Sequence, residues 1–188
     1  MDTLITQQQA LHDEADIVLK DSGLIQVLSP YGTVDVSGSY KTELMVWRDI
    51  DIGVTPKLSK DDLWKVAQKI LGLESINQIT IQDNAKKENP NAPDGYYLGV
   101  KYRHGGNVWK IDIWFADSLP QTEYDNSVKN RLDEEKRGRI LEIKNQVFEN
   151  PKYRKTFFSV DIYNAVLDAG ITNLEEFKDY LVKQNKNL

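Results

Sequence analysis

The feature that most constrains this chain lies at residues 49–54, where two acids alternate with apolar residues. Side chains two positions apart in a β-strand point to the same face. Asp49 and Asp51 are therefore expected on one face, with Ile50 and Ile52 on the opposite, buried face. Neighbouring carboxylates repel each other and raise each other's pKa unless a positive charge compensates. A divalent cation compensates directly, and carboxylate oxygens are ligands that suit magnesium or manganese.

An amphipathic strand with a solvated acidic face explains the same pattern without any chemistry, so two further features matter. Residues 110–114 repeat the alternation, and Asp112 lies between two isoleucines, which predicts that it too faces away from the core. Gly38 and Ser39 end an earlier apolar strand, about ten residues before Asp49. Glycine lets a backbone approach a phosphate closely, and exposed N–H groups with a serine hydroxyl can hold it.

In this combination the chain resembles the nucleotidyltransferase superfamily, which includes DNA polymerase beta, the antibiotic nucleotidyltransferases and the small antitoxin-type nucleotidyltransferases. The shared pattern is a Gly-Ser pair, a gap, an Asp-x-Asp flanked by apolar residues, and a later single Asp on a strand. It extends over residues 30–116, and the matching residues are Gly38, Ser39, Asp49, Asp51 and Asp112.

The resemblance implies a two-metal site and a nucleoside triphosphate as co-substrate. Asp49 and Asp51 would hold two magnesium (or manganese) ions, and Asp112 would complete the metal site that activates the attacking hydroxyl. Gly38 and Ser39 would hold the β and γ phosphates. The implied reaction moves a nucleoside monophosphate from the triphosphate to a hydroxyl of a small molecule or a protein.

The order of expected elements indicates an α+β fold, in which a nucleotidyltransferase-like mixed β-sheet packs against helices and an all-helical tail follows. We expect a core over residues 1–120 and a helical extension over residues 121–188. Residues 84–95 are expected to form an exposed loop, and residues 24–31 are ambiguous. Helices are expected over 3–22 and after Ser59, and strands over 33–37, up to Val54, 76–83, 96–103 and 107–116.

The C-terminal third carries helical patterns only. Residues 127–149 are expected to form one long helix, and residues 159–169 a shorter one that ends at Gly170. Thr172 and Glu175 have the spacing of a capping box, which predicts a last helix to about residue 184.

Composition excludes several classes of site. The chain has no cysteine, so disulfides and thiolate zinc sites are excluded, and its two histidines, His12 and His104, supply a histidine-based site poorly. The net charge of −5 makes nucleic acid an unlikely partner and a polymerase an unlikely function. No stretch has the length of a membrane span, and the N-terminal sequence lacks the basic start of a signal peptide, so a cytoplasmic location is expected.

Three further features have open alternatives. Lys110 is expected to balance the acidic cluster in preference to binding phosphate. Residues 152–155, with three cations and one tyrosine, favour a charged linker. The alternatives are a contact with the triphosphate or base of the nucleotide from the tail side, or with a nucleic-acid backbone. Trp114, on the predicted acidic face, is the candidate for stacking on a base or acceptor.

Two alternative functions remain open at this point. The first keeps the fold but makes the chain a catalytically silent, antitoxin-like binding module, with a protein partner on the helical tail. The second is an α+β domain with a solvated acidic strand and no chemistry, in which Asp112 would lie away from Asp49 and Asp51.

Overall fold

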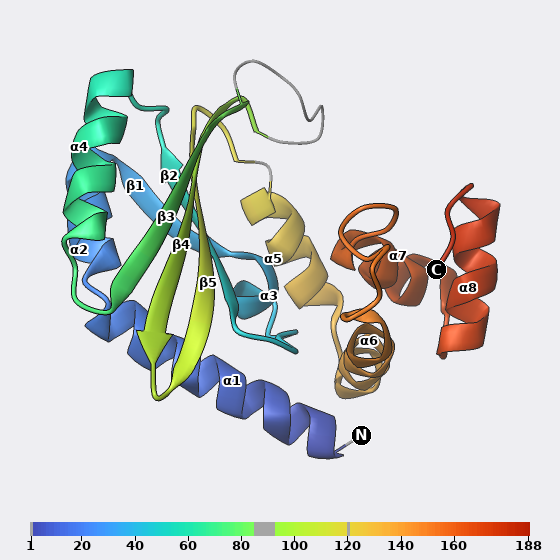
Figure 1. Cartoon of the computed structure of the whole chain (residues 1–188). Coiled ribbons are helices and arrows are strands. Elements are labelled where there is room, and N and C mark those ends of the chain that lie inside the picture. Colours follow the sequence, from blue (N-terminus) through green and yellow to red (C-terminus); the bar gives the residue numbers. More distant parts are fainter. Residues whose placement is uncertain (1, 85–92, 120) are drawn as a thin grey trace.

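A mixed β-sheet forms the centre of the molecule in the computed structural model, which describes residues 2–84, 93–119 and 121–188 (Figure 1). The strands are β1 (Thr33–Ser37), β2 (Asp49–Thr55), β3 (Ile76–Asp83), β4 (Gly95–His104) and β5 (Asn107–Ala116). Their order in the sheet is β1-β2-β5-β4-β3, with β2 and β5 parallel and the other neighbours antiparallel. The predicted α+β class and mixed sheet are confirmed.

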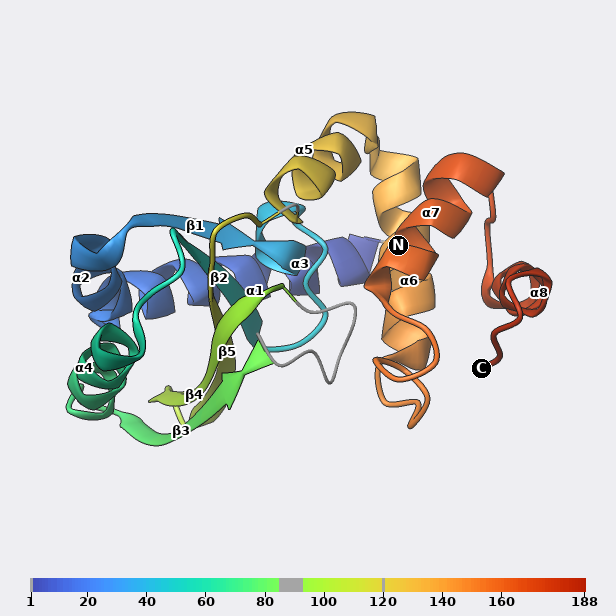
Figure 2. The same cartoon turned by 90° about the horizontal axis from the view of Figure 1, so that it is seen from above.

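Three helices cover one face of the sheet, namely α1 (Asp2–Asp21), α2 (Leu24–Leu28) and α4 (Lys60–Leu71) (Figure 2). The ambiguous segment after α1 is thus α2, followed by a 3₁₀ turn over Ser29–Tyr31. α4 begins as predicted, because the Ser59 hydroxyl accepts a hydrogen bond of 3.1 Å from the backbone N–H of Asp62.

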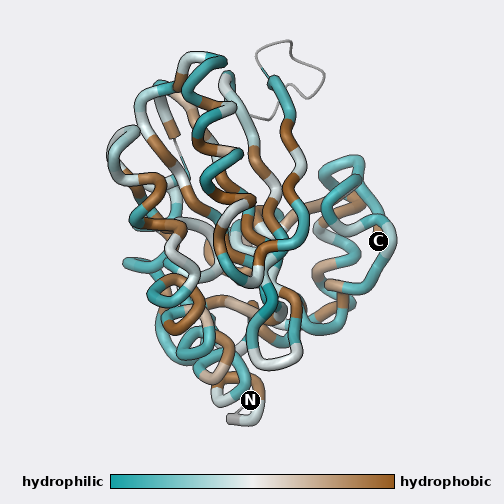
Figure 3. Tube along the Cα trace, turned by 60° about the vertical axis from the view of Figure 1, so that its left-hand side comes forward, coloured by the Kyte–Doolittle hydropathy of each residue, from teal (hydrophilic) through white to brown (hydrophobic). Residues whose placement is uncertain are grey.

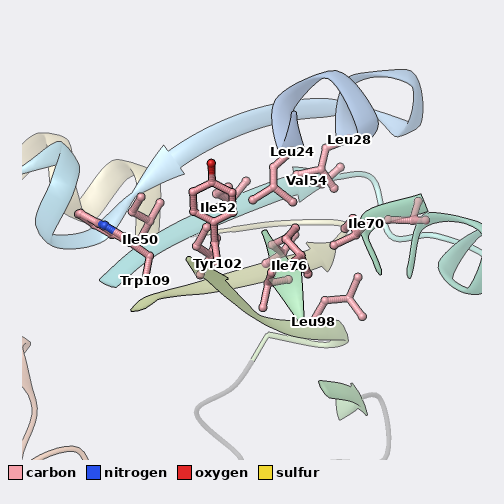
Figure 4. Close-up of a cluster of buried hydrophobic side chains, with 14 of the residues drawn as sticks. Leu24, Leu28, Ile50, Ile52, Val54, Ile70, Ile76, Leu98, Tyr102 and Trp109 are labelled. Carbon is pink, nitrogen blue, oxygen red and sulfur yellow. The ribbon is translucent and has the colours of Figure 1, made fainter. Parts of the chain in front are cut away.

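The alternation in β2 separates the hydrophobic core from the acidic face. Ile50, Ile52 and Val54 are fully buried and pack with Leu24 and Leu28 of α2 (Figure 4). This burial fixes the register of β2, because a slip by one residue would turn the isoleucines to the open face and the aspartates into the core.

The helical part follows the sheet and has its own hydrophobic cluster. This helical part consists of α5 (Gln121–Arg131), α6 (Glu134–Val147), α7 (Ser159–Ala169) and α8 (Leu174–Lys183). These helices lie beside the sheet and not over the face that α1, α2 and α4 cover (Figures 1 and 2). Leu4 and Ile5 of α1 pack against this second cluster, so α1 contacts both cores.

The prediction of one helix over residues 127–149 is wrong, because the chain forms two helices that break at Leu132 and Asp133. The Asp133 side chain accepts a hydrogen bond of 2.8 Å from the Lys136 N–H and so caps a new helix. The break lets α5 pack on α3 (Gly38–Lys41) and β1 while α6 packs on α7. Gly138, inside the predicted helix, is buried within α6 and does not interrupt it.

The predicted capping box of the last helix lies one residue too early. Asn173, and not Thr172, is the N-cap of α8, and it accepts a 3.0 Å hydrogen bond from the Glu176 N–H. Thr172 instead donates its N–H and hydroxyl to the Glu176 carboxylate. Gly170 ends α7 in the left-handed conformation as predicted.

Hydrophobic and hydrophilic residues alternate along the helices of the described ranges (Figure 3). Among these residues, no helix combines the length and apolar character that crossing a bilayer requires. The predicted loop at residues 84–95 falls mostly on residues 85–92, which lie outside the described residues.

Candidate active site

The parallel pairing of β2 with β5 brings the three predicted acids together. Asp51 lies opposite Asp112 in the register, and Asp49 lies opposite Lys110. All four side chains project from the face opposite the α1–α2 core, because the residues between them are buried isoleucines. The alternative in which Asp112 lies away from the paired acids is therefore wrong.

Lys110 lies between the acids and balances their charge, as predicted. Its ammonium group is 3.3 Å from Asp49 Oδ1 and donates a short hydrogen bond to Asp112 Oδ2. The Tyr97 hydroxyl donates to the other oxygen of Asp112 at 2.7 Å. Asp112 is thus held by two donors, which fixes its orientation beside Asp51.

The three site acids do not all converge on one point. In the described ranges, the only trio of carboxylates and imidazoles whose ligand atoms all lie within 4.8 Å of one another is the exposed set His12, Asp13 and Asp16 on α1. The site acids are farther apart than this limit. They nevertheless offer three hard oxygen ligands on adjacent strands, which is the donor chemistry that magnesium or manganese requires.

The surroundings of Asp51 raise its pKa. Burial, together with the charges of Asp49 and Asp112, raises the pKa of Asp51 to about 7. The nearby Lys110 ammonium opposes this rise but does not cancel it. A divalent cation beside Asp51 would lower this pKa again, so the electrostatics of the site fit a bound metal.

The Gly38–Ser39 pair begins α3 directly after β1. It lies next to the acids, because Ser37, the last residue of β1, pairs with Asp51. The Gly38 N–H donates to Asp125 Oδ2 at 2.6 Å, so the buried Asp125 of α5 holds this turn in place. Ser39 lines the cleft, and its hydroxyl has no hydrogen-bond partner among the residues that the structure describes.

Gly38 is required by the close approach of Asp51. Its φ of +69° is left-handed, and a Cβ at this position would lie 2.2 Å from Asp51 Oδ2. A side chain here would therefore push Asp51 out of the acidic cluster.

We expect Gly38→Ala to cost roughly 2–4 kcal/mol of stability, because it adds a clash to the left-handed strain of about 1–2 kcal/mol. The matched control is Gly105→Ala at the β4–β5 turn, where φ is +54° and a Cβ would meet nothing within 4 Å. Urea unfolding of both variants measures the difference. Equal losses in the two variants would show that the contact with Asp51 is unimportant.

The helical part contributes Arg154 and Lys144 to the site. Arg154, in the connection between α6 and α7, lies 3.1 Å from Asp49 Oδ2 and over the Trp47 ring at 4.4 Å from its centroid. The prediction that residues 152–155 are only a charged linker is therefore wrong for Arg154. Lys144 of α6 is fully buried, and it donates to the Leu44 carbonyl at 2.7 Å and lies 4.7 Å from the Trp47 centroid.

A cleft of about 680 Å³ connects the two sides. The sheet side contributes Asp49, Asp51, the Gly38–Ser39 turn and Trp114. The helical side contributes Lys144, Arg154 and Tyr163. This volume falls within the range of small-molecule and cofactor sites. Trp114 thus lies where the sequence placed it, and its role in stacking stays a prediction.

Sequence reasoning missed Lys144, Asp125 and Tyr97. Lys144 had a visible signal, because it occupies the apolar stripe of α6, three residues before Val147 and four after Ile140. Burial lowers the pKa of Lys144 to about 7. Asp125 and Tyr97 gave no such signal, since their partners Gly38 and Asp112 are distant in sequence.

Comparison with solved structures identifies the fold. The RNA terminal uridylyl transferase Cid1 aligns over 89% of this chain and 52% of its own, with a TM-score of 0.59 and 16% identity. A magnesium and 3′-dATP complex of the Cid1 poly(U) polymerase gives a TM-score of 0.56 at 14% identity, over 87% of this chain and 54% of its own. The non-canonical poly(A) polymerase complex GLD-2–GLD-3 gives 0.50 at 14% identity, over 93% and 61%.

The chain thus spans about half the length of the Cid1 structures. No protein-family model matches the chain, and no curated protein matches it in sequence. The structural matches confirm the fold that the Gly-Ser, Asp-x-Asp and single-Asp pattern implied: the chain has the fold of the nucleotidyltransferase superfamily.

Proposed function

We propose that this protein is a metal-dependent nucleotidyltransferase, which moves a nucleoside monophosphate from a nucleoside triphosphate to a hydroxyl group. The observation that carries the proposal is the β2–β5 register, which sets Asp112 beside Asp51. The structural similarity to terminal uridylyl and poly(A) polymerases supports the same chemistry.

Asp49, Asp51 and Asp112 would hold magnesium or manganese, which when bound would activate the attacking hydroxyl and neutralise the leaving pyrophosphate. Within the chain, Tyr97 and Lys110 each hold one oxygen of Asp112. They thereby fix the carboxylate that we propose receives the proton of the acceptor hydroxyl.

The triphosphate is assigned to the side of the cleft where Gly38 and Ser39 lie. The Ser39 hydroxyl, which has no partner among the described residues, would donate to a phosphate oxygen. Asp125 fixes the turn that carries it by accepting the Gly38 N–H. Lys144, when protonated, adds a buried positive charge on the helical side of the cleft. Trp114 is the cleft residue suited to stack on the base or on an aromatic acceptor.

The acceptor that we propose is a small molecule or a protein side chain. The net charge of the chain is −5, which gives no overall electrostatic attraction for a long polyanion such as RNA. The similar structures are of RNA-extending enzymes, and RNA is therefore the competing acceptor that the experiment must include.

The binding-module alternative gains no support from the helical tail. Of the large apolar residues exposed on α7 and α8 and the connection before them, Phe158 and Val160 line the cleft, and Val182 stands alone. The described part of the tail therefore shows no separate apolar patch of the kind that a docked partner covers.

The test is thermal unfolding with ATP, GTP, CTP and UTP, each with and without magnesium. Ligand at about 100 times its Kd stabilises the native state by about 2.7 kcal/mol, which raises the melting temperature of a chain of this size by several degrees. We expect a magnesium-dependent shift in the wild type that is lost in Asp49→Ala/Asp51→Ala.

The preferred nucleotide, labelled at its α-phosphate, is then offered an oligoribonucleotide, a protein mixture and a small-molecule extract as acceptors. Label in the protein or small-molecule fraction supports the proposed acceptor class, and label only in RNA contradicts it. No shift with any nucleotide in the wild type would contradict the proposed activity itself.

A further inference from the structure

Arg154 is bound at the acidic cluster by two interactions, and a third bond joins its two partners to each other. Its guanidinium lies 3.1 Å from Asp49 Oδ2, and it stacks over the Trp47 ring. The Trp47 indole N–H donates to the same Asp49 oxygen at 3.0 Å. A residue of the helical part thus occupies one oxygen of a carboxylate on β2, across the cleft.

The backbone at Arg154 is in a conformation that few residues with side chains adopt. Its φ is +66°, and its N–H donates to the Phe157 carbonyl at 2.7 Å in a tight turn. Non-glycine residues held in the left-handed conformation are strained and concentrate at functional sites. Glycine would adopt this conformation without strain. An arginine at this position therefore points to a function of its side chain.

The pairing of Arg154 with Asp49 competes with metal binding. A guanidinium and a divalent cation repel each other, and both are attracted by the same Asp49 carboxylate. Arg154 and Trp47 already bind its Oδ2, and Lys110 lies 3.3 Å from its Oδ1, so a metal at Asp49 would compete with the Arg154 guanidinium. A triphosphate arriving with the metal supplies new negative charge, and the planar guanidinium binds phosphate oxygens through two parallel hydrogen bonds.

We propose that Arg154 is a triphosphate-binding residue that exchanges partners, pairing with Asp49 before the metal–nucleotide enters and with the phosphates afterwards. The proposal rests on the proposed function. Arg154 lines the same cleft as Ser39 and Lys144, and 42% of its side chain is exposed, so it has room to turn without unfolding of the loop.

The exchange predicts effects of opposite sign when Arg154 is removed. Metal alone should bind more tightly, because its competitor at Asp49 is gone. Triphosphate should bind more weakly, because one of its ligands is gone. A residue that merely supports the shape of the site would weaken both.

The experiment uses the full chain and two probes that need neither a base nor an acceptor. Mn²⁺ alone is followed by its electron paramagnetic resonance signal, and inorganic tripolyphosphate at saturating magnesium by calorimetry. We expect Arg154→Gln to bind Mn²⁺ about three- to fivefold more tightly than the wild type. We expect its affinity for tripolyphosphate to fall by up to about tenfold. Lys155→Gln, which removes the next exposed cation in the same loop, should match the wild type for both probes.

Arg154→Lys guards against a folding defect in the first variant. It keeps the charge but loses the planar fork, so it should leave Mn²⁺ binding near the wild-type value and still weaken tripolyphosphate binding. If both affinities fall together in Arg154→Gln, or neither changes, the exchange is wrong and the proposed function stands. If the wild type binds neither probe, the proposed function itself is wrong and the exchange is wrong with it.

Discussion

Asp51→Asn is expected to lower kcat/KM for nucleotidyl transfer by about 10³-fold or more, which corresponds to roughly 4 kcal/mol of transition-state stabilisation. Asp51 lies between Asp49 on its own strand and Asp112 on the neighbouring strand. An amide is a poor replacement for a carboxylate ligand of magnesium, and the metal supplies several kcal/mol of charge stabilisation. The measurement is release of labelled pyrophosphate from the preferred nucleotide with its acceptor.

The same substitution is expected to stabilise the metal-free protein. The pKa of Asp51 is about 7 in the folded state, against a reference value of 3.8. A raised folded pKa means that the stability contributed by protonated Asp51 is complete below about pH 4 and is lost as the pH rises through 7. The neutral asparagine avoids this loss. We expect Asp51→Asn to be more stable than the wild type by about 1–3 kcal/mol at pH 8 and equal to it near pH 4.

Urea unfolding in the presence of a chelator, at both pH values, measures this gain. Asp179→Asn, an exposed acid on α8, is the control and should change stability by less than about 0.5 kcal/mol at either pH. A variant that loses activity and also loses stability at pH 8 would show that Asp51 is a structural residue, and the assignment of the acidic cluster to catalysis would fail.

Lys144→Met is expected to stabilise the protein at pH 6 by roughly 2–4 kcal/mol, which raises the melting temperature by about 5–10 °C. Lys144 is fully buried, and burial lowers its pKa to about 7 from a reference value of 10.5. Below pH 7 the folded protein must hold a buried ammonium. Methionine fills a similar volume without that charge, although it leaves the Leu44 carbonyl without its donor.

The advantage of methionine must shrink as the pH rises. Between pH 7 and 10.5 the unfolded chain binds a proton at Lys144 that the folded chain does not, so the stability of the wild type increases over this interval. Melting temperatures of the two proteins at pH 6 and pH 9.5 measure the difference, with Lys155→Met as the exposed control. A difference in melting temperature that does not change with pH would contradict the lowered pKa of Lys144. If Lys144 supplies positive charge to the cleft, Lys144→Met should also bind Mg-nucleotide more weakly.

Local patterns were sufficient for most of the elements. Alternation at residues 49–54 separated the acidic face from the buried face because the period of a strand is two residues and one face is fully covered. The Ser59 cap and the glycine at 170 involve neighbours within one helical turn, so their roles can be read from the chain alone.

The break between α5 and α6 shows where local patterns are ambiguous. Asp133 with two glutamates after it is a helix start, but Leu132 and Ile140 also continue an apolar stripe. The separate packing of α5 on β1 and α6 on α7 decides between them, and that packing is not local.

Residue type and the two-residue period of a strand were enough to predict the acids, the Gly-Ser turn and the faces of the strands. The tertiary structure alone decided that β2 pairs with β5 in the register that joins Asp51 to Asp112. The packing of the helical part also brings Arg154, from the connection between α6 and α7, and Lys144 of α6 to the cleft, about a hundred residues later in the chain. Charged residues that are far apart in the sequence come into contact only because the hydrophobic cores fix the positions of the strands and helices. The electrostatics of this site are therefore a property of the fold.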